Sequence, residues 1–443
     1  MRQIALNRLS LAGLSATLVG NGIGRFAFIA LMPALIDSAW FTKGEASQLS
    51  VATLLGYVLG AWRSDRLAHR YSPATLIRWC MLLISISFFA SAVSGWPIAW
   101  YYVWRVLAGA CGAVLMVLPA PLVVPQHAPA IRGRASGIVF SGVGLGAIIS
   151  GLLVPALVAG LGVAAIYGGQ IHPLAFSGVQ GAWLGLGALC LVLTMASWRQ
   201  WSPEAAPAVP SQLATASTGD LVETQDLAAS RTVWLILVAH GLNAVGYLAH
   251  TMFWVDYLVR ELGMSLATGG FYWSIFGLGA AVGPMLTGRL ADAFGTRRCL
   301  LAGFALKALA AALPAWASSA PALFVSSLLM GICTPGVLAL VSAYTLEVVG
   351  PQRNRQVWGK ATFSFSLAQG LGGFMMAAAV VHMDSYRLLF IASSLALLGA
   401  IGCIAAVRKG ATSAPTEQAP VLVATDAGPL ERPTAGAVLG KSC

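Results

Sequence analysis

Residues 288–298 read Gly-Arg-Leu-Ala-Asp-Ala-Phe-Gly-Thr-Arg-Arg, and a related stretch at 61–70 reads Ala-Trp-Arg-Ser-Asp-Arg-Leu-Ala-His-Arg. Each stretch follows an apolar run and places an acid a few residues before cations. The two copies occupy the same ordinal position in each half of the chain. Such a repeat predicts a duplicated architecture.

The composition around these stretches is that of a membrane protein. Of 443 residues, 58% are hydrophobic and 9% are charged, whereas soluble domains carry about 25% charged residues. So few charges cannot coat a soluble globule. This excludes a soluble enzyme, a secreted disulfide scaffold and a DNA-binding domain as the whole chain.

Apolar runs of the length that a bilayer requires, about 20 residues, occur twelve times. The predicted spans are 9–33, 47–62, 74–94, 98–122, 136–160, 179–198, 233–256, 265–288, 299–317, 321–343, 359–382 and 387–407. The sequence therefore predicts an all-α membrane protein of twelve transmembrane helices in two pseudo-symmetric six-helix bundles.

The net charge of +11 indicates how the chain is oriented in the membrane. Most Lys and Arg residues fall on one side of the predicted spans, whereas Lys43, Arg260 and Arg387 fall on the other. Positive residues gather in cytoplasmic loops. We therefore expect both termini to be cytoplasmic, in the inner membrane of a bacterium, and no nucleic-acid partner.

Two polar stretches divide the chain. Residues 199–231 are rich in Pro, Ala, Ser and Thr and separate the spans six and six, which is typical of a linker. Residues 408–443 have a similar composition, which predicts a disordered cytoplasmic tail. The expected domains are thus 1–198 and 232–407.

The stretch at 288–298 resembles the loop signature G-x-L-A-D-x-x-G-x-[RK]-[RK] of the major facilitator superfamily. The copy at 61–70 departs from it, with Ala61 and Ala68 at the glycine positions and Arg63 at an apolar one. Segments 22–27, 140–146, 181–187 and 362–373 are similar to the YbfB-type bacterial branch. The resemblance covers roughly residues 8–407.

This resemblance implies a carrier whose bundles rock around a central cavity lined by spans 1, 4, 7 and 10. It also implies that the loop aspartates brace the cytoplasmic gate when it closes. The expected gating residues are Asp65, Arg66, Arg70, Gly288, Asp292, Gly295, Arg297 and Arg298.

A second echo marks the first span of each half, Asn21-Gly-Ile-Gly24-Arg25 against Asn243-Ala-Val-Gly246-Tyr247. Spacing places Arg25 and Arg105 at similar depth in spans 1 and 4. A charge inside a span costs at least about 2.5–3.5 kcal/mol on insertion scales, so each is a functional candidate. Paired guanidiniums recognise carboxylate, sulfonate or phosphate groups.

Structural alternatives exist for both arginines. Arg105 could pair with backbone carbonyls or steady its helix. Arg25 could snorkel outward or pair with Asp37. Lys307 falls in the ninth span, which the family fold places at the periphery, and this favours snorkelling or helix packing.

The seventh span carries a polar stripe, His240, Asn243, Tyr247 and His250, which should face the bundle interior. His250 is a candidate proton-responsive group, or a neutral histidine bonded to a neighbouring helix. Asp256 is expected at the outer edge of the span as a gate or solvated residue. The predicted substrate-binding set is Arg25, Arg105, Asn21, Asn243, Tyr247, His250 and Gln369.

The sequence lacks the motifs of an ATP-driven pump or a metal-dependent protein. The sequence has no Walker motif and no metal-ligand cluster, and its seven cysteines are expected to pack as small apolar residues. The glycines of span 5 resemble the family's antiporter motif without its Pro. We expect no cofactor, no metal and no enzyme activity.

These features predict a monomeric secondary transporter for a small organic anion, with H⁺ as the candidate coupling ion. One alternative keeps the fold and exports amphipathic drugs by proton antiport. Another is a transporter-like sensor or scaffold that signals through its tail.

Overall fold

The computed structural model describes residues 6–407 apart from 129–130, 161–163, 168–169, 174–177 and 202–230. The predicted linker therefore lies almost wholly outside the described residues, as does the predicted tail. Residues up to Val407 pack as one compact unit. Division of the chain into domains 1–198 and 232–407 stays a prediction.

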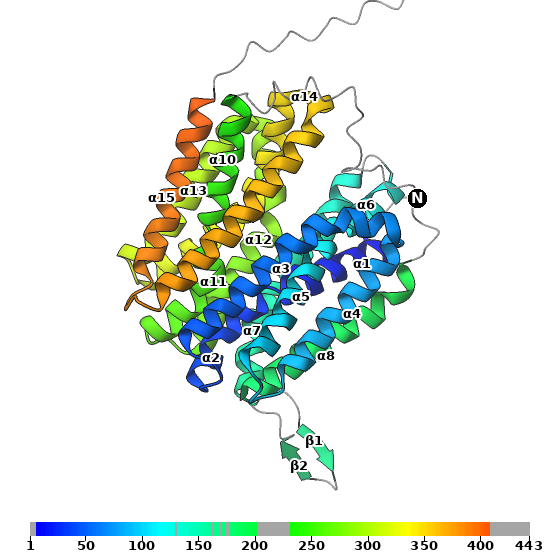
Figure 1. Cartoon of the computed structure of the whole chain (residues 1–443), viewed down its shortest axis with the longest axis vertical. Helices are drawn as coiled ribbons and strands as arrows, with labels where there is room; N and C mark the ends of the chain where they lie inside the picture. The colour runs from blue at the N-terminus through cyan, green and yellow to red at the C-terminus, as the bar shows by residue number, and fades with distance from the viewer. Residues whose placement is uncertain are drawn as a thin grey trace, which may run out of the picture. The chain divides into compact units, whose positions relative to one another are not determined.

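The described chain is almost entirely helical (Figure 1). The helices of the first half are α1 (Arg8–Thr17), α2 (Ala27–Asp37), α3 (Lys43–Arg70), α4 (Pro73–Ser91), α5 (Ile98–Val117), α6 (Pro119–Val123), α7 (Arg132–Val158) and α8 (Gly178–Ser197). Those of the second half are α10 (Arg231–Val245), α11 (Leu248–Asp256), α12 (Leu266–Phe294), α13 (Thr296–Trp316), α14 (Ala320–Val380) and α15 (Arg387–Ala406).

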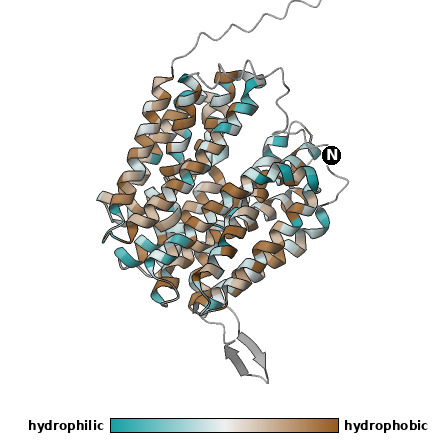
Figure 2. Ribbon diagram, in the orientation of Figure 1, coloured by the Kyte–Doolittle hydropathy of each residue, from teal (hydrophilic) through white to brown (hydrophobic). Residues whose placement is uncertain are grey.

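These helices supply the predicted spans. Eleven in the described part are long and apolar enough to cross a membrane, and α3 occupies the position of the remaining one. Within α14, Gly350 has φ 76° and separates two spans, Ala320–Gly350 and Gln356–Val380. Hydrophobic residues dominate the helices (Figure 2).

One element was not expected from the sequence. Strands β1 (Ala164–Tyr167) and β2 (Gln170–Pro173) pair antiparallel in the connection between α7 and α8, with Ala164 opposite Pro173. The predicted spans end at 160 and resume at 179, so the hairpin lies between spans. It does not change the class of the fold.

The first span of each half is broken. In the first half, α1 continues into a π-helical segment, Leu18–Ile23, and residues 24–26 separate it from α2. In the second half, residues 246–247 separate α10 from α11. The two breaks coincide with the repeated Asn-x-x-Gly pattern. Breaks and π-bulges within spans are typical of functional sites.

The two copies of the loop motif end their helices differently. Helix α12 ends at Gly295, whose φ of 87° and ψ of 141° favour glycine. At the corresponding position of the first copy stands Ala68, and α3 continues to Arg70 before it ends at Tyr71. Because α3 lacks this glycine, it ends several residues later in the motif than α12 does.

We predict that Gly295→Ala lowers the free energy of unfolding by about 1–3 kcal/mol, because Ala is strained at this backbone conformation. The matched control is Gly288→Ala inside α12, where an added Cβ meets no atom within 4 Å. That variant should keep or raise stability, because Ala favours helix. Heat-induced unfolding of the purified variants measures both. Equal melting temperatures would contradict the prediction.

The two halves meet mainly along two pairs of helices, α7 with α12 and α3 with α14, and α2 also contacts α11 and α12. A Cβ on Gly151 would lie 2.4 Å from the Gly270 oxygen, and one on Gly144 would lie 2.5 Å from the Ala281 nitrogen. Further along α7, a Cβ on Gly137 would meet nothing within 4 Å. Helices α7 and α12 therefore touch at their middle and separate toward one end.

The other helix pair separates toward the same end. A Cβ on Gly373 would lie 2.7 Å from Leu54 Cδ1, but one on Gly370 would lie 3.9 Å from the nearest atom, Val58 Cγ2. Beyond them, Trp62 and Phe363 are exposed. We call this end, which carries Arg66, Arg132 and Arg297, the basic end. The bundles are apart there and together at the opposite end.

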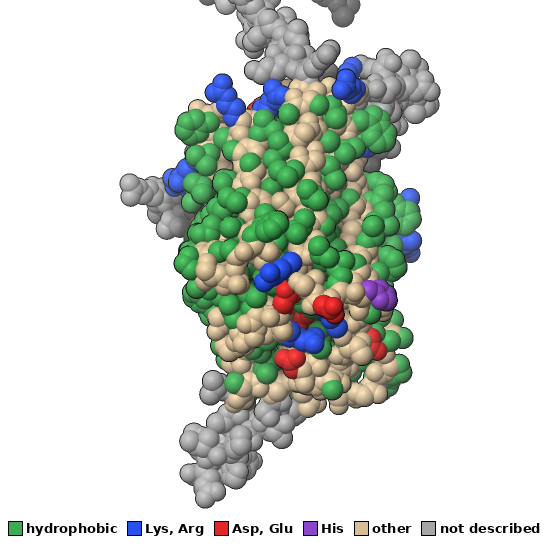
Figure 3. Space-filling view, turned by 90° about the vertical axis from the view of Figure 1, so that its left-hand side faces the viewer, with side chains coloured by type: hydrophobic (Ala, Val, Ile, Leu, Met, Phe, Trp, Pro, Cys, Tyr) green, Lys and Arg blue, Asp and Glu red, His purple; other side chains and the backbone are tan. Residues whose placement is uncertain are grey.

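Ionic and polar contacts join the bundles at the opposite end. Asp37 Oδ1 lies 3.4 Å from Arg260 Nε. Lys43 donates a hydrogen bond to the Met383 oxygen (3.3 Å), and its Nζ lies 4.3 Å from the centre of the Tyr386 ring. The face in Figure 3 shows acidic and basic side chains together toward its lower end and basic ones at its upper end.

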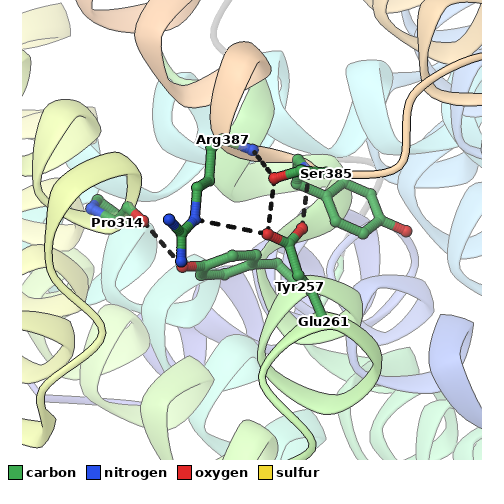
Figure 4. Close-up of polar contacts among 6 residues, drawn as sticks. Tyr257, Glu261, Pro314, Ser385 and Arg387 are labelled. Atoms are coloured by element: carbon green, nitrogen blue, oxygen red, sulfur yellow. Dashed lines mark hydrogen bonds and ion pairs between the residues drawn. The ribbon is translucent and has the colours of Figure 1, made fainter.

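Within the second bundle, a carboxylate organises this opposite end (Figure 4). Glu261 accepts hydrogen bonds of 2.7 Å from the Ser385 hydroxyl and from the Tyr386 backbone, and it lies 3.7 Å from Arg387 Nε. Nearby, the Tyr257 hydroxyl donates to the Pro314 oxygen at 2.8 Å. These contacts fix the loop before α15, which presents Met383 and Tyr386 to Lys43.

Candidate functional site

Arg25 and Tyr247 lie at the two helix breaks and meet across the bundles. Arg25 Nη2 lies 3.4 Å from the Tyr247 hydroxyl. The Arg25 guanidinium also lies 5.5 Å from the centre of the Phe26 ring and 5.9 Å from that of Tyr57. Arg25 is partly exposed.

Tyr247 is the centre of this group. Gln369 of α14 donates from Nε2 to the Tyr247 hydroxyl, and the Phe365 ring stacks on the Tyr247 ring at 6.0 Å. Gln369 is fully buried, and its Oε1 has no hydrogen-bond partner among the described residues. The contacts of Arg25 do not include Asp37, which pairs with Arg260 instead.

Arg105 is used differently from Arg25. It is buried, donates from Nη1 to the Gly24 oxygen at 3.1 Å, and lies 4.5 Å from the centre of the Phe28 ring. Gly24 is part of the break in the first span, where carbonyl groups lose helical partners. Arg105 therefore braces the break, as the structural alternative expected. Its buried Nε has no partner within the described chain.

Two other predicted residues bond to their surroundings. Asn21 donates from Nδ2 to the Gly112 oxygen of α5 at 3.1 Å. His250 Nε2 lies 2.9 Å from the Ser326 hydroxyl of α14, and its ring stacks on Trp254. Both are buried. His250 matches the alternative of a histidine bonded to a neighbouring helix.

Of the two roles expected for Lys307, snorkelling and helix packing, the structure excludes snorkelling and supports helix packing. Lys307 is fully buried. Its Nζ donates to Asn243 Oδ1 at 2.8 Å and lies 4.8 Å from the centre of the Tyr247 ring. Its position near the middle of α13 leaves either membrane surface beyond reach, and the break at Tyr247 provides polar partners. A single charge within an apolar span marks Lys307 in the sequence as unusual. The partners of that charge depend on tertiary packing.

For Asp256, expected at the outer edge as a gate or a solvated residue, the solvated alternative was wrong, and the gate stays a prediction. Asp256 is fully buried and accepts a hydrogen bond from the Tyr386 hydroxyl. The π-helical continuation of α11, Tyr257–Glu261, carries the span further than predicted. The end of the span therefore falls at Arg260 and Glu261, which make the contacts expected of an outer edge.

Among the expected gating residues, Arg297 makes local contacts in this conformation. Arg297 Nη2 donates to the oxygens of Ile404, Ala405 and Val407, at 3.3, 3.0 and 3.1 Å, and so caps α15. Asp292 and Arg298 are exposed. The Asp65 side chain lies outside the described residues. The bracing of a closed gate stays a prediction, since the bundles are apart at this end.

Of the seven predicted binding residues, the structure brings Arg25, Tyr247 and Gln369 into direct contact. Arg105 joins them through Gly24, and Asn243 joins through Lys307. Asn21 and His250 support the helices around them. The described residues contain no group of His, Cys, Asp and Glu side chains that could hold a metal ion.

A separate cavity of about 550 Å³ lies between α10 and α14. It is lined by Val233, Trp234, Leu237, Val238, Gly359, Lys360, Phe363, Ser364 and Leu367. None of the seven predicted binding residues lines it. Its lining is mostly apolar, in contrast to the polar contacts around Tyr247.

Two helical bundles, with broken spans that meet at a central polar group, define the class of major facilitator transporters. Solved structures share the fold. A bacterial homolog of the human lysosomal transporter Spinster is 18% identical, with a TM-score of 0.64 over 90% of this chain and 93% of that one. A D-xylose–proton symporter is 14% identical, with a TM-score of 0.67 over 89% and 96%.

The sequence comparison identifies the family. Residues 17–405 match the family described as "Uncharacterised MFS-type transporter YbfB", and the chain belongs to it. A gallate transporter of Pseudomonas putida is 32% identical over 170 residues, which are 37% of this chain and 36% of that protein. The match thus spans about a third of that relative. The protein is a multi-pass membrane transporter.

Proposed function

We propose that this transporter carries small organic anions, and aromatic carboxylates of the gallate type in particular, by alternating access. The observation that carries the proposal is the Arg25 guanidinium. It is partly exposed at the break of the first span, and its contacts are a hydroxyl and two aromatic rings. A carboxylate would complete its donors with charge-assisted hydrogen bonds.

The surroundings of Arg25 suit an aromatic solute. The rings of Phe26 and Tyr57 lie beside the guanidinium, and the Tyr247 hydroxyl faces it from the other bundle. Gallate carries a carboxylate on a ring with hydroxyl groups. The carboxylate would bind Arg25, and the ring would contact the aromatic side chains. The Pseudomonas putida relative supports this class of cargo.

Arg25 and Tyr247 belong to different bundles and contact each other. A solute bound between them would therefore contact both bundles. A solute bound to Arg25 and Tyr247 would attract both halves, and their relative tilt exposes the site to one side at a time. In this conformation the bundles are apart at the basic end. By the distribution of basic residues we place that end, and both termini, in the cytoplasm of a bacterium, with the protein in its inner membrane.

The test is transport of labelled gallate by Arg25→Gln in proteoliposomes. Loss of one charge-assisted interaction is worth about 1.5–3 kcal/mol, so we expect gallate transport to fall about 10–100-fold. Arg25→Lys keeps the positive charge but lacks the forked donors of a guanidinium. Its rate of gallate transport should therefore lie between those of Arg25→Gln and the wild type. Arg8→Gln removes an exposed arginine at the start of α1 and should match the wild type.

Transport of gallate at the wild-type rate by correctly inserted Arg25→Gln would refute the role of Arg25. Failure of the wild type to bind or move any aromatic acid would refute the cargo. Amphipathic drugs, tested beside gallate by thermal shift of the purified protein, address the alternative of drug export, since a bound ligand stabilises the folded state.

A further inference from the structure

Lys307 is a buried basic residue that the proposed site does not use. Lys307 lies near the middle of α13, fully buried, with Nζ 2.8 Å from Asn243 Oδ1 and 4.8 Å from the centre of the Tyr247 ring. Besides Tyr247, the titratable groups that interact with Lys307 among the described residues are His240 and His250 of the seventh span and Cys333 of α14. None of these neighbours is a carboxylate.

This environment makes the charge of Lys307 sensitive to its neighbours. A permanent ammonium within a span costs at least about 2.5–3.5 kcal/mol without a counter-ion, and buried lysines change protonation readily. Asn243 Oδ1 accepts a hydrogen bond from a neutral amine as well as from an ammonium. The same packing therefore accommodates both states, and a nearby negative charge favours the protonated one.

Tyr247 connects this lysine to the solute site. Lys307 lies against the Tyr247 ring, while the hydroxyl of the same ring lies 3.4 Å from Arg25 Nη2. An anion bound to Arg25 would thus be separated from Lys307 by one aromatic side chain. Charges attract strongly across such a distance when water is excluded. Binding of the anion and binding of a proton must then favour each other reciprocally.

We propose that Lys307 is the proton-binding group of this transporter, which takes up a proton when the anion binds at Arg25 and releases it when the anion leaves. The inference rests on the proposed function. The amine of Lys307 accepts one proton from water on the side where the solute enters, and the ammonium returns it to water on the other side. Nothing is oxidised or reduced, and one proton accompanies each bound carboxylate.

The experiment compares two kinds of gallate flux in proteoliposomes that contain Lys307→Gln. Exchange of labelled for unlabelled gallate without a gradient requires the solute site and the rocking of the bundles. Accumulation driven by a pH gradient also requires the proton. We expect Lys307→Gln to keep exchange within about threefold of wild type and to lose accumulation by at least about tenfold. A pH-sensitive dye inside the vesicles should report loss of gallate-linked proton flux.

The controls separate Lys307 from other lysines and from the buried histidines. Lys360→Gln makes the same change at a partly exposed lysine of α14 and should keep both fluxes. Lys307→Arg holds a permanent charge and should exchange without proton flux. Loss of gallate-linked proton flux in His240→Gln or His250→Gln, with its retention in Lys307→Gln, would assign the proton to a histidine and overturn the proposal.

A binding measurement distinguishes loss of the proton-binding group from a defect in the folding of the variant. Calorimetric titration of purified protein with gallate, in two buffers of different ionisation enthalpy, counts the protons taken up on binding. The wild type should take up about one proton, and Lys307→Gln should take up none. Equal uptake by both overturns the role of Lys307, as does absence of uptake by a wild type that transports gallate. Absence of gallate exchange in the wild type refutes the proposed function instead.

Discussion

Gly144→Val should abolish most transport and shift the bundles out of the conformation described above. A Cβ at this position would lie 2.5 Å from the Ala281 nitrogen and 2.6 Å from the Gly277 oxygen of α12. Both are backbone atoms of a packed helix, which cannot move aside as a side chain can. Overpacking costs about 1–3 kcal/mol or more, so we expect transport to fall by about 10–100-fold.

The same substitution at Gly137 should have the opposite effect and hold the bundles in the present conformation. An added Cβ at Gly137 meets no atom within 4 Å in this conformation, but rocking of the bundles would bring α12 toward it. Gly137→Val should therefore stabilise the present conformation and hinder its reversal. Gly402→Val is the control, because Gly402 is exposed on α15 and has free space around its Cα.

Spin labels at Trp62→Cys and Phe363→Cys, in a background without other cysteines, measure these shifts. Both positions are exposed at the basic end, on α3 and α14. Gly144→Val should shorten the distance between the labels, and Gly137→Val should keep it long. Unchanged distance distributions and transport in both variants would show that these glycines do not control the approach of α7 and α12.

Tyr247→Phe should lower gallate transport by about tenfold or more, because the lost hydroxyl leaves the buried Gln369 amide without its partner, at a cost of about 1–3 kcal/mol. It also removes the contact that joins Arg25 to the second bundle. The ring stays, so packing against Phe365 and Lys307 should persist. Both exchange and accumulation of gallate should fall together, unlike in Lys307→Gln.

Tyr257→Phe provides a matched control for this loss. Its hydroxyl donates to the Pro314 oxygen at 2.8 Å within the second bundle, away from Arg25. We expect this variant to lose about 1 kcal/mol of stability and to keep gallate transport. Equal transport by Tyr247→Phe and wild type would exclude the hydroxyl from the solute site, and equal losses in both variants would indicate a general effect of buried tyrosines.

Local sequence determined the class of this protein, and two of its repeated patterns coincide with departures from regular helix. Apolar runs predict spans because lipid offers no partners to backbone groups, and the repeated Asn-x-x-Gly pattern marks both broken spans. The positive φ of Gly295, and the longer α3 where Ala68 replaces the glycine, also follow from residue type.

Tertiary structure alone decided which polar groups meet. Arg25 and Arg105 look alike as single charges in apolar runs, yet one is partly exposed toward Tyr247 and the other is bonded to the Gly24 oxygen. Lys307 reaches Asn243 from a different span. The partner of a buried charge depends on how helices far apart in sequence pack. Helical periodicity fixes the face of a residue, but not the neighbour that this face meets.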